Sequence, residues 1–133
     1  IIHFAAYKAV GESVSKPLEY YRNNLVSLIH LLEGMNENGI PAIVFSSSCT
    51  VYGQPEKLPV TEDSPIQPAI SPYGNTKQIG EEIIRDTVAA NKNIKAISLR
   101  YFNPIGAHKS GLIGELPRGV QENLVPFITQ TAI

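Results

Sequence analysis

Cysteine is almost absent from this chain of 133 residues, in which Cys49 is the only one. A single thiol excludes an internal disulfide framework, and the histidines and acidic residues show no spacing typical of metal ligands. We therefore expect no metal site. The lack of thiol pairs fits a reducing compartment, so we expect a cytoplasmic location.

Long apolar runs and clusters of like charge are missing too. No apolar run approaches the roughly 20 residues that cross a bilayer, and no basic segment precedes the apolar start of the chain. Eleven basic and twelve acidic residues are spread along the chain and leave a formal charge of −1. These features argue against a membrane or nucleic-acid partner and favour a small-molecule ligand.

Strand-like and helix-like segments alternate along the chain, which is 43% hydrophobic and long enough to bury a core. Alternation of this kind predicts βαβ units that build a parallel sheet flanked by helices, an α/β fold. We expect strands at residues 1–6, 42–47 and 94–101, and helices at 17–36, at 72–91 and from about 123.

The two long helices have different sequence signals. The first carries apolar side chains that we expect on one face: Leu18, Tyr21, Leu25, Leu28, Ile29 and Leu32. The second begins with Ser71 as a candidate N-cap and Pro72 at its first position. A proline-rich segment precedes it, which predicts an irregular loop.

Neither end of the chain resembles the edge of a domain. Residues 1–6 already form a strand-like run, and the chain closes at Ile133 inside an apolar periodic segment that has no glycine cap. We therefore interpret the chain as an internal fragment of a longer protein.

Tyr73 and Lys77 lie four residues apart, and Ser48 closes a hydroxyl cluster upstream. On a helix this spacing places a phenol and an ammonium on one face. A nearby positive charge favours the phenolate, so Lys77 would bring the tyrosine pKa down from about 10 towards a useful range. The constellation predicts proton transfer by Tyr73, with Ser48 relaying or positioning the proton.

Each of these residues also has a plain structural explanation. Tyrosine and lysine four apart usually decorate a solvated helix face, and residues 46–48 are ordinary turn formers on their own. Lys8 is equally well explained as a solvated lysine, and Asn23 as a surface residue of an amphipathic helix. Only the combination of these segments favours a functional site.

Six segments together carry a family resemblance. They are HFAAYKAVGES (3–13), YYRNN (20–24), SSSCTVYG (46–53), SPYGNTK (71–77), RYFNPIGAH (100–108) and NLVP (123–126). In this order and spacing they resemble the extended short-chain dehydrogenase/reductase family over the entire chain, and within it the nucleotide-sugar epimerases. The resemblance implies a Rossmann-like fold and NAD as the cofactor.

The same resemblance implies a domain organisation. Residues 1–133 would form the central part of an NAD-binding Rossmann-like domain, with 104–133 entering the substrate-binding region. The glycine-rich strand-to-helix turn that cradles a pyrophosphate would precede Ile1, and most of the substrate domain would follow Ile133. The isolated chain would then be inactive.

The resemblance assigns roles residue by residue. Tyr73 would be the acid/base, Lys77 would hold the nicotinamide ribose and polarise the phenol, and Ser48 would complete the triad. The remaining cofactor contacts would be Phe4, Ala5, Ala6, Lys8, Asn23 and Phe102. The UDP-sugar would contact Ser48, Tyr73, Asn103 and Asn123.

The implied reaction interconverts UDP-glucose and UDP-galactose. Tyr73 would remove the 4-hydroxyl proton while a hydride passes from C4 to NAD, and a 4-keto sugar would rotate and regain the hydride on its other face. Family members commonly form homodimers through the helices expected here near 17–36 and 72–91.

Three alternatives stay open at this point. A 4,6-dehydratase or decarboxylase of the same fold is disfavoured, because Cys49 and Thr50 follow Ser48 where the dehydratases would carry carboxylates. An epimerase for another UDP-sugar, such as UDP-N-acetylglucosamine, also stays open, because the residues that would select N-acetylated sugars would lie after Ile133. A non-catalytic Rossmann-like binding module is the least favoured, since both Tyr73 and Lys77 are present.

Overall fold

The computed structural model describes residues 1–106, 108–113 and 123–131 and divides the chain into two units. Unit 1 comprises Ile1–Tyr101, and unit 2 comprises Phe102–Ile133. Each unit is described by itself.

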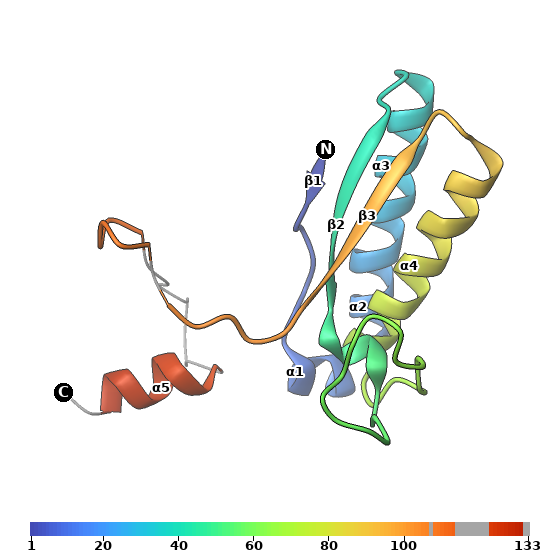
Figure 1. Cartoon of the computed structure of the whole chain (residues 1–133). Coiled ribbons are helices and arrows are strands. Elements are labelled where there is room, and N and C mark those ends of the chain that lie inside the picture. Colours follow the sequence, from blue (N-terminus) through green and yellow to red (C-terminus); the bar gives the residue numbers. More distant parts are fainter. Residues whose placement is uncertain (107, 114–122, 132–133) are drawn as a thin grey trace. The chain divides into compact units, whose positions relative to one another are not determined.

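Unit 1 contains a three-stranded parallel sheet in the order β1-β2-β3, as the alternating segments predicted. The strands are β1 (Ile2–His3), β2 (Ala42–Ser48) and β3 (Lys95–Tyr101). Because the strands run in the same direction, the carboxyl ends of β2 and β3 lie at one edge of the sheet, where Ser48 pairs with Tyr101 (Figure 1).

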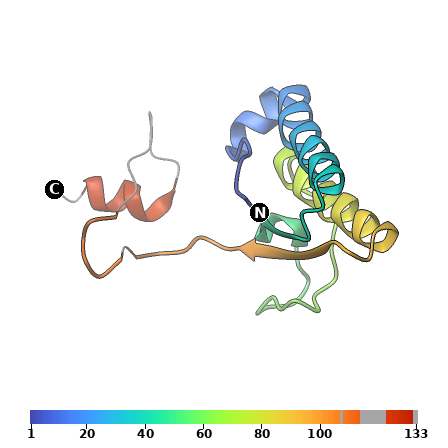
Figure 2. The same cartoon turned by 90° about the horizontal axis from the view of Figure 1, so that it is seen from above.

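The long helices α3 (Ser27–Glu37) and α4 (Pro72–Ala90) cover one face of this sheet (Figure 2). The shorter helical segments are α1 (Val10–Ser15), α2 (Pro17–Tyr21), the π-helix η1 (Arg22–Val26) and the 3-10 helix η2 (Cys49–Tyr52), which follows the end of β2. On the other face, Ile2 and Ile97 are 67% and 60% exposed, and both pair with Val44 in the register. Apolar side chains on an open face are unusual for a parallel sheet, which is normally covered on both sides.

The core of unit 1 lies between the sheet and the two long helices. Its buried residues are Leu28, Leu32, Met35, Ile43, Phe45, Ile84 and Ile94. Helix α4 approaches β2 closely at Gly80, where an added Cβ would lie 2.9 Å from the ring tip of Phe45 and 3.4 Å from Leu28. The absence of a side chain at Gly80 therefore sets the distance between helix and strand.

The first strand is shorter than the predicted 1–6. Only Ile2 and His3 pair with β2, opposite Val44 and Phe45. The chain leaves the sheet at Phe4, so residues 4–9 form a loop between β1 and α1, which we call the β1–α1 loop.

The predicted helix over 17–36 is interrupted, and the expected apolar face is partly wrong. Leu18 is 79% exposed, while the buried side chains over this stretch are Tyr20, Asn24, Leu28, Leu32 and Met35. Residues four apart drift by about 40° per step around an α-helix. The wider π turn of η1 reduces that drift and keeps the four-residue series on one face.

The second long helix matches its prediction closely. Ser71 caps α4, because its side chain accepts a hydrogen bond from the backbone N–H of Gly74 at 3.1 Å, and Pro72 occupies the first turn. The proline-rich segment before it contains no regular element. Gly53 opens this loop with φ +56°, and a Cβ there would lie 2.5 Å from the carbonyl of Pro68.

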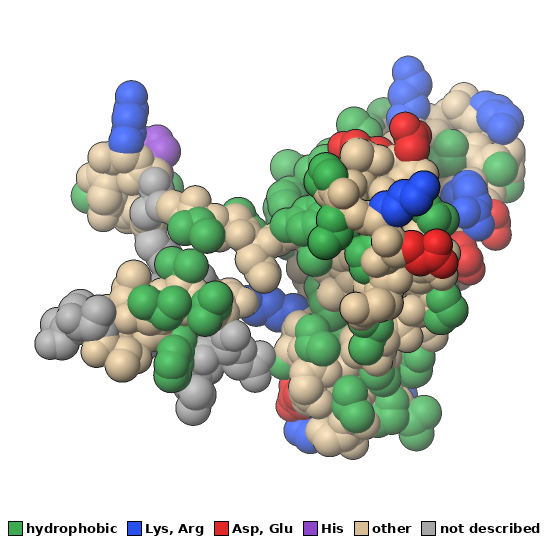
Figure 3. All heavy atoms as spheres, turned by 60° about the horizontal axis from the view of Figure 1, so that its bottom comes forward, with side chains coloured by type: hydrophobic (Ala, Val, Ile, Leu, Met, Phe, Trp, Pro, Cys, Tyr) green, Lys and Arg blue, Asp and Glu red, His purple; other side chains and the backbone are tan. Residues whose placement is uncertain are grey.

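Unit 2 contains the helix α5 (Leu124–Thr131), which agrees with the helix predicted from about 123. The sequence also predicts a glycine-rich loop at 106–119, and this prediction lies partly outside the described residues. Across the described ranges, no helix is long and apolar enough to cross a membrane, and no group of histidine, cysteine and acidic side chains could hold a metal ion. Acidic and basic side chains are mixed over the face of unit 1 shown in Figure 3.

We predict that Gly80→Ala and Gly34→Ala change the stability of the full-length protein differently. Both glycines lie inside helices, so alanine brings the same helix-propensity gain of about 1 kcal/mol at each position. A Cβ at Gly34 meets nothing within 4 Å, whereas at Gly80 it overpacks the core. Urea unfolding should find Gly80→Ala less stable than Gly34→Ala by about 1–3 kcal/mol, and equal stabilities would contradict the close approach.

Candidate active site

The three residues of the predicted triad come together in unit 1, where β2 ends and α4 begins. Ser48 is the last residue of β2, and Tyr73 and Lys77 lie in the first turns of α4. This edge holds the carboxyl ends of the parallel strands, where open α/β sheets bind their ligands (Figure 1).

Ser48 has a fixed position at this edge. It is 8% exposed, and its hydroxyl accepts a hydrogen bond from the backbone N–H of Thr50 at 3.2 Å, which caps η2. Its side chain lies near the phenol of Tyr73 and lowers the pKa of that group. The structure thus brings the serine close to a tyrosine that lies 25 positions later in the sequence.

The pKa of Tyr73 is raised, which differs from the expectation that Lys77 would lower it. Burial is the main cause, since it disfavours the phenolate, and the hydrogen bond with Ser48 offsets part of the effect. The Cys49 thiol adds a smaller increase. In the chain described here, Tyr73 therefore keeps its proton at neutral pH.

Lys77 is a buried cation at the centre of the site. Its side chain is 4% exposed, and its ammonium donates a hydrogen bond to the carbonyl of Ser46 at 2.7 Å. The nitrogen also lies 5.1 Å from the centre of the Phe45 ring and 5.7 Å from that of Tyr73. Burial lowers the pKa of Lys77 to about 8.

Beside the triad lies a charged cluster that the sequence analysis did not single out. Arg100 on β3 donates two hydrogen bonds to the Glu81 carboxylate of α4, at 3.0 and 2.7 Å, and a third to the Tyr52 hydroxyl at 3.0 Å. Ser47 donates to the same carboxylate at 2.5 Å. Two-point pairing of this kind fixes orientation, so the cluster holds α4 against the ends of β2 and β3.

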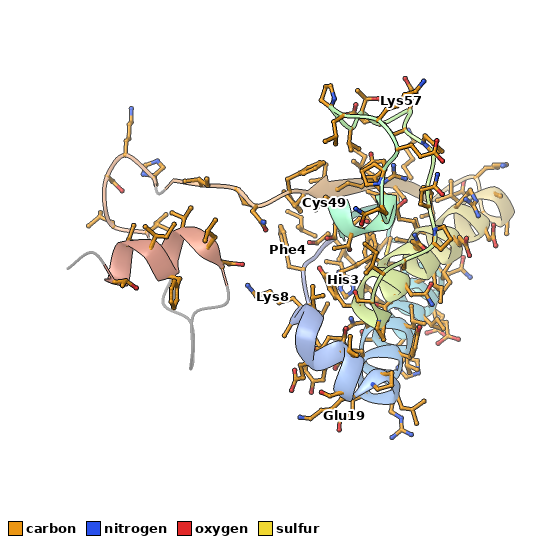
Figure 4. The ribbon with its side chains drawn as sticks, turned by 90° about the horizontal axis from the view of Figure 1, so that it is seen from below. His3, Phe4, Lys8, Glu19, Cys49 and Lys57 are labelled. Atoms are coloured by element: carbon orange, nitrogen blue, oxygen red, sulfur yellow. The ribbon has the colours of Figure 1, made fainter. Side chains whose placement is uncertain are left out.

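The predicted cofactor contacts at the start of the chain lie in the β1–α1 loop. Phe4 is 61% exposed and lies against Tyr101, with ring centres 6.2 Å apart. Ala5 and Lys8 are exposed and Ala6 is half-buried. Figure 4 shows Phe4 and Lys8 extending from the same side of unit 1, so they are accessible to a ligand.

Asn23, another predicted cofactor contact, is half-buried, and its amide donates to the side chain of Asn24 at 2.9 Å. The neighbouring Asn24 is 6% exposed and was not identified from the sequence. The only sequence signal for Asn24 is its spacing, because it lies four positions before Leu28 in a series of otherwise apolar residues.

Phe102, Asn103 and Asn123 belong to unit 2, where all three are exposed. Their predicted contacts with cofactor and substrate stay predictions.

Taken together, the site offers hydroxyls and one ammonium. Ser48, Tyr73 and Lys77 provide donors and acceptors suited to the hydroxyl groups of a ribose and of a sugar. This donor set fits a nicotinamide dinucleotide and a sugar nucleotide.

The chain matches the model of the NAD dependent epimerase/dehydratase family over residues 1–129. It belongs to this family. A UDP-glucose 4-epimerase of Cyamopsis tetragonoloba is 57% identical over 133 residues, which are the whole of this chain and 38% of that protein.

Two solved structures give the same comparison in three dimensions. The UDP-glucose 4-epimerase of Bifidobacterium longum, in complex with NAD+ and UDP, matches 98% of this chain and 39% of its own with 51% identity and a TM-score of 0.94. That of Stenotrophomonas maltophila, with NAD and a formylated UDP-arabinopyranose, matches the same shares with 47% identity and a TM-score of 0.92. The chain thus spans a little over a third of the length of the relatives it matches.

We predict that Lys77 makes stability depend on pH. Below about pH 8 the ammonium is protonated in both the folded and the unfolded protein; between about 8 and 10.5 only the unfolded state keeps the proton. The free energy of unfolding therefore rises with pH between about pH 8 and 10.5, because the unfolded state binds more protons there. Between pH 7 and 9.5, the full-length protein without added nucleotide should gain about 2 kcal/mol relative to Lys77→Met.

Denaturant unfolding at the two pH values measures this difference. Lys92→Met, which removes an exposed lysine of the same chain, is the matched control and should follow the wild type. Parallel pH profiles for Lys77→Met and the wild type would contradict the burial of a charged Lys77.

Proposed function

We propose that the full-length protein interconverts UDP-glucose and UDP-galactose by inverting C4 of the hexose through a 4-keto intermediate, with NAD bound throughout. The observation that carries this proposal is the convergence of Ser48, Tyr73 and Lys77 at the ligand-binding edge of the sheet. The chain in which these three residues converge is 57% identical to a UDP-glucose 4-epimerase.

NAD, when bound, supplies the acceptor for the hydride that leaves C4 and returns to it. Lys77 would hold the ribose next to the nicotinamide, and Phe4, Ala5, Ala6, Lys8, Asn23 and Phe102 would complete the cofactor site. The exposure of Phe4 and Lys8 in the β1–α1 loop supports this assignment, because both are free to meet a ligand.

Tyr73 would take the proton of the sugar 4-hydroxyl and later return it. Its raised pKa keeps the proton in place when no substrate is bound, which suits the donating step. The accepting step needs a stabilised phenolate, and Lys77 can supply the charge: a pKa of about 8 leaves most of its ammonium protonated at pH 7. We infer that this cation, 5.7 Å from the centre of the phenol ring, favours the phenolate that forms at neutral pH when substrate is bound.

Ser48 would position the proton path. Its hydroxyl is held by the backbone N–H of Thr50 and lies near the phenol of Tyr73, so it is placed to link that phenol to a sugar hydroxyl. Proton transfer needs the reacting groups aligned before the substrate binds. The hydrogen bond from Thr50 provides this alignment by holding the Ser48 hydroxyl in place. Asn103 and Asn123 would contact the UDP-sugar.

A nucleotide-sugar dehydratase is the second candidate. Eliminating water from the sugar needs an extra acid and base next to the serine, but the residues after Ser48 are Cys49 and Thr50. Glu81, a carboxylate that reaches towards this edge, is already bound by Arg100 and Ser47. Both observations favour epimerisation.

The open face of the sheet supports the view that the chain is part of a larger Rossmann-like domain. Ile2, Ile97 and Leu99 are exposed there, and further strands and helices would cover them. The glycine-rich turn for the pyrophosphate and most of the substrate domain would lie in those parts.

We also propose a cytoplasmic homodimer that uses α3 and α4. A groove between these helices is lined partly by the apolar side chains of Ile29, Leu32, Ile83 and Ala90. Light scattering of the full-length protein checks this, and a monomer would overturn it.

The proposed reaction is tested by conversion of UDP-galactose to UDP-glucose by the full-length protein and its Tyr73→Phe variant. This change removes the proton-transfer group and keeps the ring, so kcat should fall by about 10²–10⁴-fold. Tyr21→Phe, which removes another hydroxyl that is hydrogen-bonded to α4 through Asn75, is the control and should keep activity.

Each other outcome excludes a specific part of the proposal. Full activity of Tyr73→Phe would remove Tyr73 as the acid/base. A 4-keto-6-deoxy product would establish the dehydratase, and turnover of UDP-N-acetylglucosamine alone would establish a different substrate. A protein that binds no NAD would revive the non-catalytic module.

A further inference from the structure

Asn24 is a buried side chain outside the predicted triad, and it makes four hydrogen bonds. Its Oδ1 accepts from the backbone N–H of Tyr7 at 2.8 Å and from the amide of Asn23 at 2.9 Å. Its Nδ2 donates to the carbonyl of Tyr7 at 3.0 Å and to Oγ1 of Thr76 at 3.1 Å. Two acceptor positions and two donors are the full capacity of a carboxamide.

Tyr7 lies in the middle of the β1–α1 loop, between Ala6 and Lys8, two residues predicted to contact the cofactor. Because Asn24 bonds both the N–H and the carbonyl of Tyr7, it holds this backbone as a neighbouring β-strand would. The side chain of Tyr7 has no part in these bonds. The loop therefore depends on Asn24 for its backbone pairing at this point.

Thr76 continues the connection into α4. It is 1% exposed, accepts from Asn24, and donates its own hydroxyl hydrogen to the carbonyl of Tyr73 at 2.7 Å. A continuous path of hydrogen bonds thus runs from the β1–α1 loop through Asn24 and Thr76 to the backbone of Tyr73. It spans three segments that are far apart in the sequence.

We propose that Asn24 is a positioning residue that fixes the cofactor-binding β1–α1 loop relative to the helix that carries Tyr73 and Lys77. This inference rests on the proposed function, since it takes that loop as part of the NAD site. The π turn of η1 contributes by keeping Asn24 on the inward face, between Tyr20 and Leu28.

The chemistry of the site requires asparagine. An aspartate would keep both acceptors but lose both donors, and its charge would face the Tyr7 carbonyl and the Thr76 oxygen. Glutamine carries one more methylene and would not fit the same buried space. An alanine would leave the N–H and carbonyl of Tyr7 without their partner.

The test compares the full-length wild type with Asn24→Asp and Asn24→Ala, well below the melting temperature of each protein. The Kd for NAD of reconstituted protein, the Kd for UDP, and kcat are measured. We expect both variants to bind NAD about 10-fold more weakly or worse and to lose kcat, because the Tyr7 backbone and the buried Thr76 hydroxyl lose the partner that joins them. UDP carries no hexose for Tyr73 and should bind unchanged.

Asn38→Asp is the matched control. Asn38 is exposed, and its amide donates to the Gly34 carbonyl at the end of the helical stretch that follows η1. This change should leave the Kd for NAD as in the wild type. A lowered melting temperature of the Asn24 variants with unchanged NAD affinity and kcat would show a merely structural role and overturn the proposal.

Thr76 provides a second test that does not depend on Asn24 variants folding. Thr76→Ser keeps the hydroxyl and should retain NAD affinity, whereas Thr76→Val removes it and should weaken binding. Equal affinities for these two variants would also overturn the proposal. A wild type that binds no NAD would instead count against the proposed function, so the two failures are distinguishable.

Discussion

The hydrogen bond from the Lys77 ammonium to the Ser46 carbonyl is the constraint on which the site depends. A buried cation is tolerated only where its donors are satisfied and its surroundings are favourable. Here the carbonyl lies at 2.7 Å and two aromatic rings lie nearby. Gly80 lies about one helical turn after Lys77 and lets α4 approach β2 closely. Because of this close approach, the start of the same helix places Tyr73 near the strand end where Ser48 lies.

Helix α4 is consequently the element to which the rest of unit 1 is attached. Its polar side chains hydrogen-bond residues of other segments: Thr76 bonds Asn24, Gln78 bonds the carbonyls of Val51 and Gln67, and Glu81 bonds Arg100. The apolar core holds the middle of the helix, and these bonds fix its first turns. A site for proton transfer benefits from such rigidity, since its groups must be aligned before the substrate arrives.

Sequence patterns predicted the structural features that depend on neighbouring residues. They did not predict the features that depend on contacts between residues far apart in the sequence. The Ser71 cap, the Pro72 start and the hydroxyl end of β2 follow from neighbouring residues, and all were predictable. The Asn24–Thr76 bond joins residues 52 positions apart, and no local pattern indicates it. The π turn likewise exists because Tyr20, Asn24 and Leu28 share one face, a tertiary requirement that overrode the regular helix expected over 17–36.

The most direct test of the account is kcat of the full-length protein at pH 7, where most of the Lys77 ammonium is protonated, measured at saturating NAD and UDP-galactose for the wild type and for Lys77→Met. If the Lys77 charge stabilises the phenolate of Tyr73, kcat falls in Lys77→Met and stays at the wild-type value in Lys92→Met. An unchanged kcat in Lys77→Met would contradict the central claim that Lys77 acts on the phenol.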